Sequence, residues 1–135
     1  MPYEEGEPYK LIAKKSNLSI IDFISPLSDA KRISMITRDS QGFIYLISHL
    51  GTTGSSNKKE NLNLIVENIK NSTNTPVYVG FGVDEKTAKE KSKNVDGVIV
   101  GSTLLKVALD DNLTLSKKIL NMSRMVKNIK EAINS

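Results

Sequence analysis

The sequence predicts an α/β protein built on a parallel β-sheet. Short, nearly continuous apolar runs, rich in β-branched and aromatic residues, recur along the chain, as is typical of strands that are buried on both faces. Between these runs lie segments with apolar residues at three-to-four spacing, which is the pattern of amphipathic helices. Because parallel strands need a long crossover connection, this strict alternation favours βαβ units over hairpins.

Each expected strand is bounded by turn residues; the strands are at residues 19–24, 42–47, 76–80 and 97–100. The expected helices lie at residues 8–16, 28–37, 62–71, 84–93, 103–109 and 114–133. Ser28 and Asp84 are expected to cap two of them. The last helix carries one apolar stripe, formed by Leu115, Ile119, Met122, Val126, Ile129 and Ile133. This order fits both a doubly wound sheet and a segment of a (β/α)8 barrel.

Length and composition narrow the possible functions. With 135 residues, the chain is expected to form a single domain, residues 1–135. A complete (β/α)8 barrel needs about 250 residues, so barrel elements could make only about half of the ring. The net charge of +4 comes from lysines scattered through helical stretches, and aromatic residues are few, so a nucleic-acid partner is not expected.

Several kinds of site are excluded by residue counts. The absence of cysteine excludes disulfides and thiolate ligands, and a single histidine, His49, excludes a histidine pair; His49 is expected to be solvated. No metal and no cofactor are expected. Apolar runs stay well below the roughly 18 residues of a membrane helix, and residues 1–8 are acidic where a signal peptide would be basic. A cytoplasmic protein with no membrane partner is therefore expected.

Glycine-rich turns follow three of the strands, at residues 51–56, at Gly80 and Gly82, and at Gly101 with Ser102. Ligands bind at the carboxyl ends of parallel strands in both candidate architectures. Gly101 opens directly into a helix, whose first N–H groups can bind an anion, and glycines at 80 and 82 allow a second backbone segment to approach it. A single turn of this kind is more often only a tight turn, but two on consecutive strands favour a phosphate site.

Segments along the whole chain resemble the tryptophan synthase alpha chain family. In chain order they are Pro2 with Glu4 and Glu5 after the family's fourth strand, residues 24–29 at the end of its fifth, 42–54 at its sixth, 76–83 at its seventh and 96–106 at its eighth. The resemblance implies the C-terminal half of a TIM (β/α)8 barrel, with four parallel strands. It also implies a lyase of tryptophan biosynthesis that cleaves indole-3-glycerol phosphate, by an aldol cleavage, to indole and glyceraldehyde 3-phosphate.

The same resemblance implies roles for individual residues. The residues that bind the substrate phosphate would be Gly54, Gly80, Gly82, Gly101 and Ser102. Those that line the substrate pocket would be Ile24, Tyr45, Thr53 and Phe81. In the family the threonine that matches Thr53 contacts an aspartate of an earlier loop, and this sequence has no counterpart of that aspartate.

No catalytic residue is assigned, because both catalytic carboxylates of the family lie on or after its second strand, in the half that this chain lacks. Asp84 is expected to be a helix cap, and Asp29 to lie in the first turn of its helix. Asp22 falls inside a strand where the family is apolar, and a buried acid there is costly unless it is paired. It is either a tolerated substitution or, less expectedly, a new functional acid.

A half barrel leaves open sheet edges and exposes residues of the barrel interior, so a partner is expected. The candidates are a second copy of the chain, a separately made N-terminal half, and the family's beta chain. Three functions remain open: an enzyme component that is inactive without the other half, a non-catalytic module that binds phosphate or the beta chain, and an unrelated phosphate-binding barrel enzyme or flavin-binding fragment.

Overall fold

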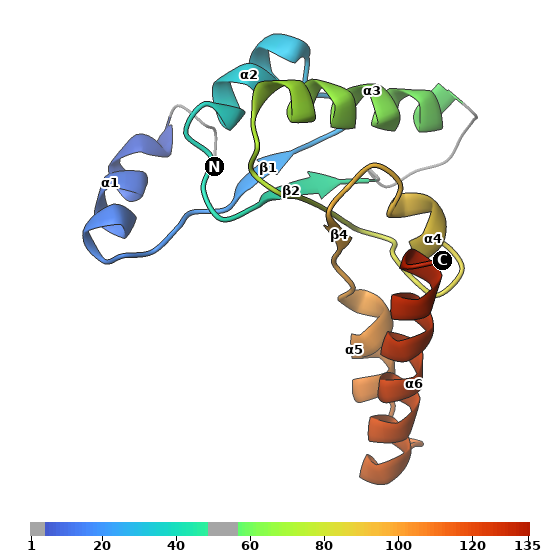
Figure 1. Cartoon of the computed structure of the whole chain (residues 1–135). Coiled ribbons are helices and arrows are strands. Elements are labelled where there is room, and N and C mark those ends of the chain that lie inside the picture. The colour runs from blue at the N-terminus through green and yellow to red at the C-terminus, as the bar shows by residue number, and fades with distance from the viewer. Residues whose placement is uncertain (1–4, 49–56) are drawn as a thin grey trace. The chain divides into compact units, whose positions relative to one another are not determined.

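Helices and strands alternate in the predicted order (Figure 1). The structure is a computed structural model that describes residues 5–48 and 57–135, and of residues 57–61 it describes the backbone alone. The elements are α1 (Glu7–Lys15), β1 (Asp22–Ile24), α2 (Ala30–Thr37), β2 (Ile44–Ile47), α3 (Asn57–Ser72), β3 (Val77–Gly80), α4 (Ala88–Lys91), β4 (Gly97–Val98), α5 (Ser102–Ala108) and α6 (Leu115–Ile133). The chain divides into two compact units, Met1–Val77 and Tyr78–Ser135.

In the first unit, β1 and β2 pair in parallel, with Phe23 opposite Tyr45 and Ile24 opposite Leu46. Directly opposed residues of a parallel pair share one face of the sheet, so the buried face carries Ile24 and Leu46, both 0% exposed. Helix α2 packs against β1 and against α3, which places the core of this unit between the strands and these helices. The other face carries Phe23 and Tyr45, and Phe23 is 55% exposed.

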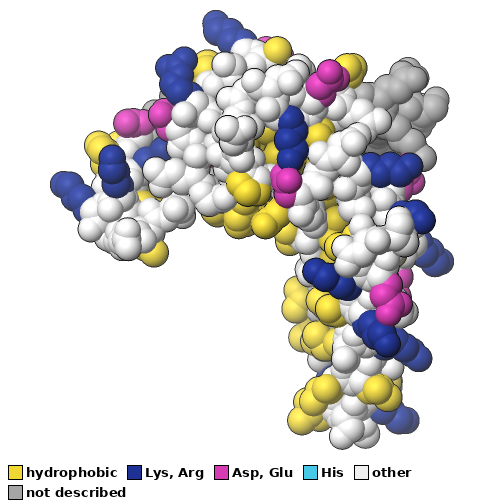
Figure 2. Space-filling view, viewed as in Figure 1, with side chains coloured by type: hydrophobic (Ala, Val, Ile, Leu, Met, Phe, Trp, Pro, Cys, Tyr) yellow, Lys and Arg dark blue, Asp and Glu magenta, His cyan; other side chains and the backbone are white. Residues whose placement is uncertain are grey.

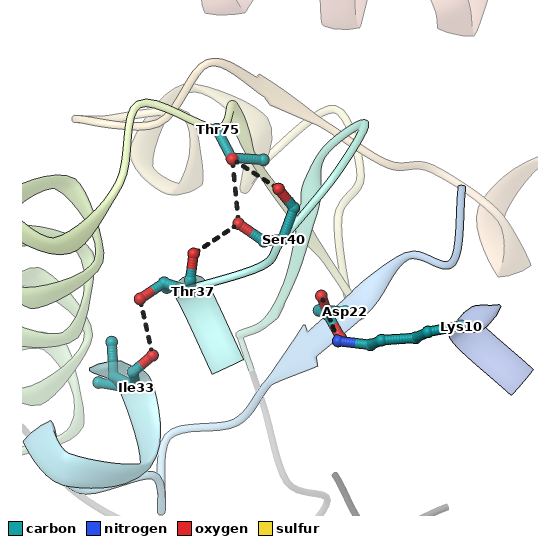
Figure 3. Close-up of polar contacts among 6 residues, drawn as sticks. All are labelled: Lys10, Asp22, Ile33, Thr37, Ser40 and Thr75. Carbon is teal, nitrogen blue, oxygen red and sulfur yellow. Dashed lines mark hydrogen bonds and ion pairs between the residues drawn. The ribbon is translucent and has the colours of Figure 1, made fainter. Parts of the chain in front are cut away.

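Hydroxyl groups hold together the loops that precede β2 and β3 (Figure 3). The Ser40 hydroxyl lies 3.1 Å from the Thr37 carbonyl oxygen and 3.0 Å from Thr75 Oγ1. Thr37 in turn donates to the Ile33 carbonyl oxygen of the preceding helical turn, at 2.9 Å. These contacts satisfy the buried hydroxyl of Thr37 and the half-buried hydroxyls of Ser40 and Thr75, and they connect the segments that lead into both strands.

In the second unit, β3 and β4 pair in parallel, with Tyr78 opposite Gly97 and Val79 opposite Val98. The Ile99 amide donates to the Val79 carbonyl oxygen at 2.8 Å, which continues the ladder by one residue. Helix α6 packs against both α4 and α5. The core of this unit consists of Val83, Ala88 and Ile129, with Val98, Val100 and Ile133 packed against them.

The predicted apolar stripe of α6 is covered at one end only. Ile129 is 5% exposed, whereas Leu115 and Ile119, near the start of the helix, are 72% and 60% exposed. Figure 2 shows hydrophobic side chains on the surface that α5 and α6 form. Leu105 and Leu109 of the α5 region extend this exposed apolar surface, and patches of this kind usually mark an interaction site.

Some predicted boundaries were wrong. The first strand begins at Asp22 instead of residue 19, and the predicted helix at residues 84–93 is reduced to Ala88–Lys91. The N-cap of α2 is Asp29, whose side chain accepts from the Arg32 amide at 2.7 Å, and not Ser28. Ser28 instead accepts from the Ser25 amide at 3.3 Å, so it closes the turn that precedes the helix.

Candidate functional site

The turn after β3 has an unusual backbone conformation. Phe81 and Gly82 have φ values of 67° and 66°, in the left-handed region that side chains with a Cβ rarely adopt. Glycine adopts it at little cost, but Phe81 does not, and such strain in a non-glycine residue is concentrated at functional sites. Phe81 is 55% exposed, so burial of its ring does not explain the conformation.

The turn after β4 leaves its backbone open to a ligand. Gly101 is the N-cap of α5, and a Cβ placed on it would meet nothing within 4 Å. The next residue, Ser102, begins the helix and is exposed. A hydroxyl and backbone N–H groups at such a position are donors suited to an anion.

These two turns lie at the same end of one strand pair. Because β3 and β4 are parallel, their carboxyl ends meet at one edge. A hydrogen bond also connects the segments that follow the two strands, since Thr103 Oγ1 donates to the Val83 carbonyl oxygen at 3.1 Å. The structure therefore brings together Gly80, Gly82, Gly101 and Ser102, the residues that the sequence places around a phosphate.

A positively charged side chain that the sequence analysis missed contacts the turn after β3. The amine of Lys91, the last residue of α4, donates to the carbonyl oxygens of Phe81 at 2.8 Å and Gly82 at 2.7 Å. Burial lowers the pKa of Lys91 from its ordinary value of 10.5, while Asp84 and Glu90 oppose that shift. No motif marks this lysine among its neighbours, because the contact depends on how a short helix packs beside the turn.

The other predicted pocket residues lie in the first unit or outside the described residues. Tyr45 stacks on Phe23 with ring centroids 4.7 Å apart and the ring planes at 14°. Ile24 lies on the opposite, buried face of the β1 and β2 pair, where it is 0% exposed. Thr53 and Gly54, like His49, fall outside the described residues.

Asp22 has a partner that the sequence did not reveal. Its side chain is 10% exposed and lies 3.2 Å from the amine of Lys10 in α1 (Figure 3). The pairing offsets the cost of placing an acid among apolar residues. A structural ion pair accounts for Asp22 without a catalytic role.

The sequence predicted that Asp84 caps a helix, but the N-cap of α4 is Thr87, and Asp84 instead caps the turn that precedes this helix. Its Oδ1 accepts from the Lys86 amide at 3.0 Å, the Thr87 amide at 2.9 Å and the Thr87 hydroxyl at 2.8 Å. The two bonds from Thr87 lower the pKa of Asp84 below its ordinary value of 3.8, with a smaller contribution from Lys86, although burial acts in the opposite direction. All these bonds favour the charged carboxylate.

Replacing Asp84 with alanine is expected to reduce the free energy of unfolding by about 1 kcal/mol, because the bonds that it accepts in this turn are like those of a helix cap. Because the folded-state pKa lies below 3.8, the stabilisation is present above that pH and is lost as the pH falls through the lowered value. Urea unfolding of the full chain at several pH values measures this. Asp84→Asn serves as the control, since it has no carboxyl group to protonate at this position. Its free energy of unfolding should therefore fall less than that of the wild type as the pH is lowered through the Asp84 pKa. An equal fall in the wild type and in Asp84→Asn would contradict the assignment.

Residues 5–48 and 57–135 contain no group of three or more His, Cys, Asp or Glu side chains that could hold a metal ion. Within the same residues, no helix has the length and apolar character needed to cross a membrane.

Comparison with known proteins decides the family. The sequence profile of the tryptophan synthase alpha chain matches residues 1–134. The chain belongs to the tryptophan synthase alpha chain family. The tryptophan synthase alpha chain of Wolinella succinogenes is 45% identical over 136 residues, and that of Halalkalibacterium halodurans is 37% identical over 123 residues. They are matched over 100% and 88% of this chain.

The solved structures of this family confirm the predicted fold. The tryptophan synthase alpha subunit of Campylobacter jejuni superposes with a TM-score of 0.82 over 93% of this chain and 50% of its own, at 27% identity. The chain likewise spans about half the length of the curated relatives, 53% and 46% of the two named above. Its four strands and their helices are therefore part of a (β/α)8 barrel.

Proposed function

We propose that this chain forms the C-terminal, phosphate-binding half of an enzyme that cleaves indole-3-glycerol phosphate to indole and glyceraldehyde 3-phosphate. The observation that supports this most directly is the meeting of two glycine turns at one end of the β3 and β4 pair, joined by the bond from Thr103 to Val83. In phosphate-binding barrels the phosphate lies at the loops after the last two strands. Membership of the alpha chain family supplies the substrate.

Gly80, Gly82, Gly101 and Ser102 would hold the phosphate. Gly101 leaves room for close approach of an oxygen, and Ser102 offers a hydroxyl donor at the start of α5. The pocket roles of Phe81 and Tyr45, like those of Ile24, Thr53 and Gly54, rest on the family resemblance alone.

The chemistry requires groups that this chain does not provide. Aldol cleavage needs one acid to protonate the indole carbon and one base to take the proton of the glycerol hydroxyl, as the carbon–carbon bond breaks. Asp22 is paired with Lys10, and Asp84 caps a helix turn, so neither is available for these roles. We therefore assign the catalytic carboxylates to the N-terminal half of the family barrel, and expect residues 1–135 alone to be inactive.

A second candidate is a non-catalytic module that binds phosphate or the family's beta chain, or that associates with a second copy of itself. The exposed apolar residues Leu105, Leu109, Leu115 and Ile119 favour a partner of some kind. Recovery of activity with an N-terminal half distinguishes the enzyme component from such a module.

Inorganic phosphate is expected to shift the amide signals of Gly82, Gly101, Ser102 and Thr103 before those of other residues. Ser102→Ala should weaken binding by roughly 1 kcal/mol, the net value of one hydrogen bond, or somewhat more because the acceptor is charged. A nuclear magnetic resonance titration of the full chain measures both effects. Ser92, in the turn after α4, is the matched control, because Ser92→Ala should leave the affinity unchanged. Shifts confined to another part of the chain would reject the site.

A further inference from the structure

Lys91 forms hydrogen bonds to the turn after β3, at which the phosphate is proposed to bind. Its amine accepts no bond and donates to two consecutive carbonyl oxygens, those of Phe81 at 2.8 Å and Gly82 at 2.7 Å. A Cβ added to Gly82 would lie 3.0 Å from this amine, so glycine at 82 also makes room for the lysine. Charge-assisted bonds of this kind are stronger than bonds between neutral groups.

The direction of these two carbonyl groups sets the direction of the amides that follow them. In a planar trans peptide, the carbonyl oxygen of one residue and the N–H of the next point in opposite directions. With the oxygens of Phe81 and Gly82 turned toward Lys91, the N–H groups of Gly82 and Val83 are turned away from it. The lysine thus orients donors away from itself at the carboxyl end of β3.

The conformation held in this way is one that the chain would not favour without help. Phe81 has a φ of 67° and Gly82 a φ of 66°, and the first of these is strained because Phe81 carries a Cβ. Asp84 and Glu90 are the acidic groups that act on Lys91, and Asp84 is already engaged in its own turn. The lysine amine, in contrast, donates to the carbonyl oxygens of the strained Phe81 and of Gly82.

We propose that Lys91 is a positioning residue of the phosphate site: by binding the carbonyl oxygens of Phe81 and Gly82, it holds the turn so that its amides face the phosphate. This inference rests on the proposed function of the turn. Lys91 would act on the phosphate through the backbone of Phe81 and Gly82. The positive charge of Lys91 also favours an anion nearby.

Three variants of the full chain test this role. Lys91→Met keeps the aliphatic stem but removes the charge and the donors, and it should weaken binding of inorganic phosphate on the order of tenfold. Lys91→Arg keeps donors and charge and should restore most of the affinity. Lys89→Met is the matched control, because it removes the same charge from an exposed position of α4 and should change the affinity little.

A measurement without ligand separates positioning from simple attraction of charge. A strong nuclear Overhauser effect between the amide and Hα protons of Phe81 reports its positive φ, and we expect it in the wild type and in Lys91→Arg but not in Lys91→Met. Unchanged phosphate affinity in Lys91→Met, or an equal loss in Lys89→Met, would overturn the inference. A wild-type chain that shows the Overhauser effect but binds no phosphate would reject the proposed function while leaving the hold of Lys91 on the turn intact.

Discussion

The isolated chain is expected to release no measurable indole from indole-3-glycerol phosphate, and to gain activity when it is mixed with a fragment that carries the first four strands of the family barrel. Each positioned acid or base contributes on the order of 10²–10⁴ to the rate, so the absence of both leaves binding without chemistry. The N-terminal fragment would return these groups. Indole formation by each component and by the mixture provides the measurement.

Two controls make this complementation specific. A mixture in which the N-terminal fragment lacks its carboxylates should stay inactive, and a mixture with the Ser102→Ala chain should be active with weaker substrate binding. Phosphate binding without any recovery of activity would favour the binding-module candidate. Indole release by the chain alone would show that a carboxylate of this half, such as Asp22 or Asp84, has been misjudged.

Breaking the ion pair between Lys10 and Asp22 should have the second large effect. Lys10→Met leaves the Asp22 carboxylate without this partner at a site where its side chain is 10% exposed. Loss of one partner of a fully buried pair costs about 3–5 kcal/mol. Because the Lys10 side chain is 21% exposed, and water can reach the vacated position, we expect a decrease of about 1–3 kcal/mol in the free energy of unfolding, measured by urea denaturation.

The double variant Lys10→Met, Asp22→Ile provides the control. Replacing both members of such a pair by apolar residues is often neutral or stabilising, so the double variant should recover the stability that Lys10→Met loses. Isoleucine at position 22 also matches the apolar residues Ile24, Ile44 and Leu46 that share this buried face. If the double variant is as unstable as Lys10→Met, the loss comes from the lysine stem packing and not from the unpaired acid.

Three features of this protein could be determined from the sequence because they depend on local patterns. Apolar runs separated by helical periodicity gave the order of elements that the structure has, from α1 to α6. The glycines at positions 80, 82 and 101 follow strands directly, and parallel strands must end at the same edge, so their proximity could be predicted. That Asp84 binds local backbone amides was likewise predictable, since its partners are within three residues, although the N-cap of α4 proved to be Thr87.

Other features depended on contacts between distant residues, which no local pattern contains. Three of them follow from how helices pack on strands and on one another: the pairing of Lys10 with Asp22, the covering of only one end of the α6 stripe, and the burial of Ile24 on the face opposite Tyr45. The hold of Lys91 on the turn at Phe81 and Gly82 is of the same kind. The sequence by itself determined the order of elements and the glycine turns, because these depend on spacing along the chain, and it indicated the family through the resemblance of its segments to the alpha chain. Only the tertiary structure decided which charged side chains form ion pairs and which contact the candidate site, because the partner of a long side chain depends on which distant residues pack beside it.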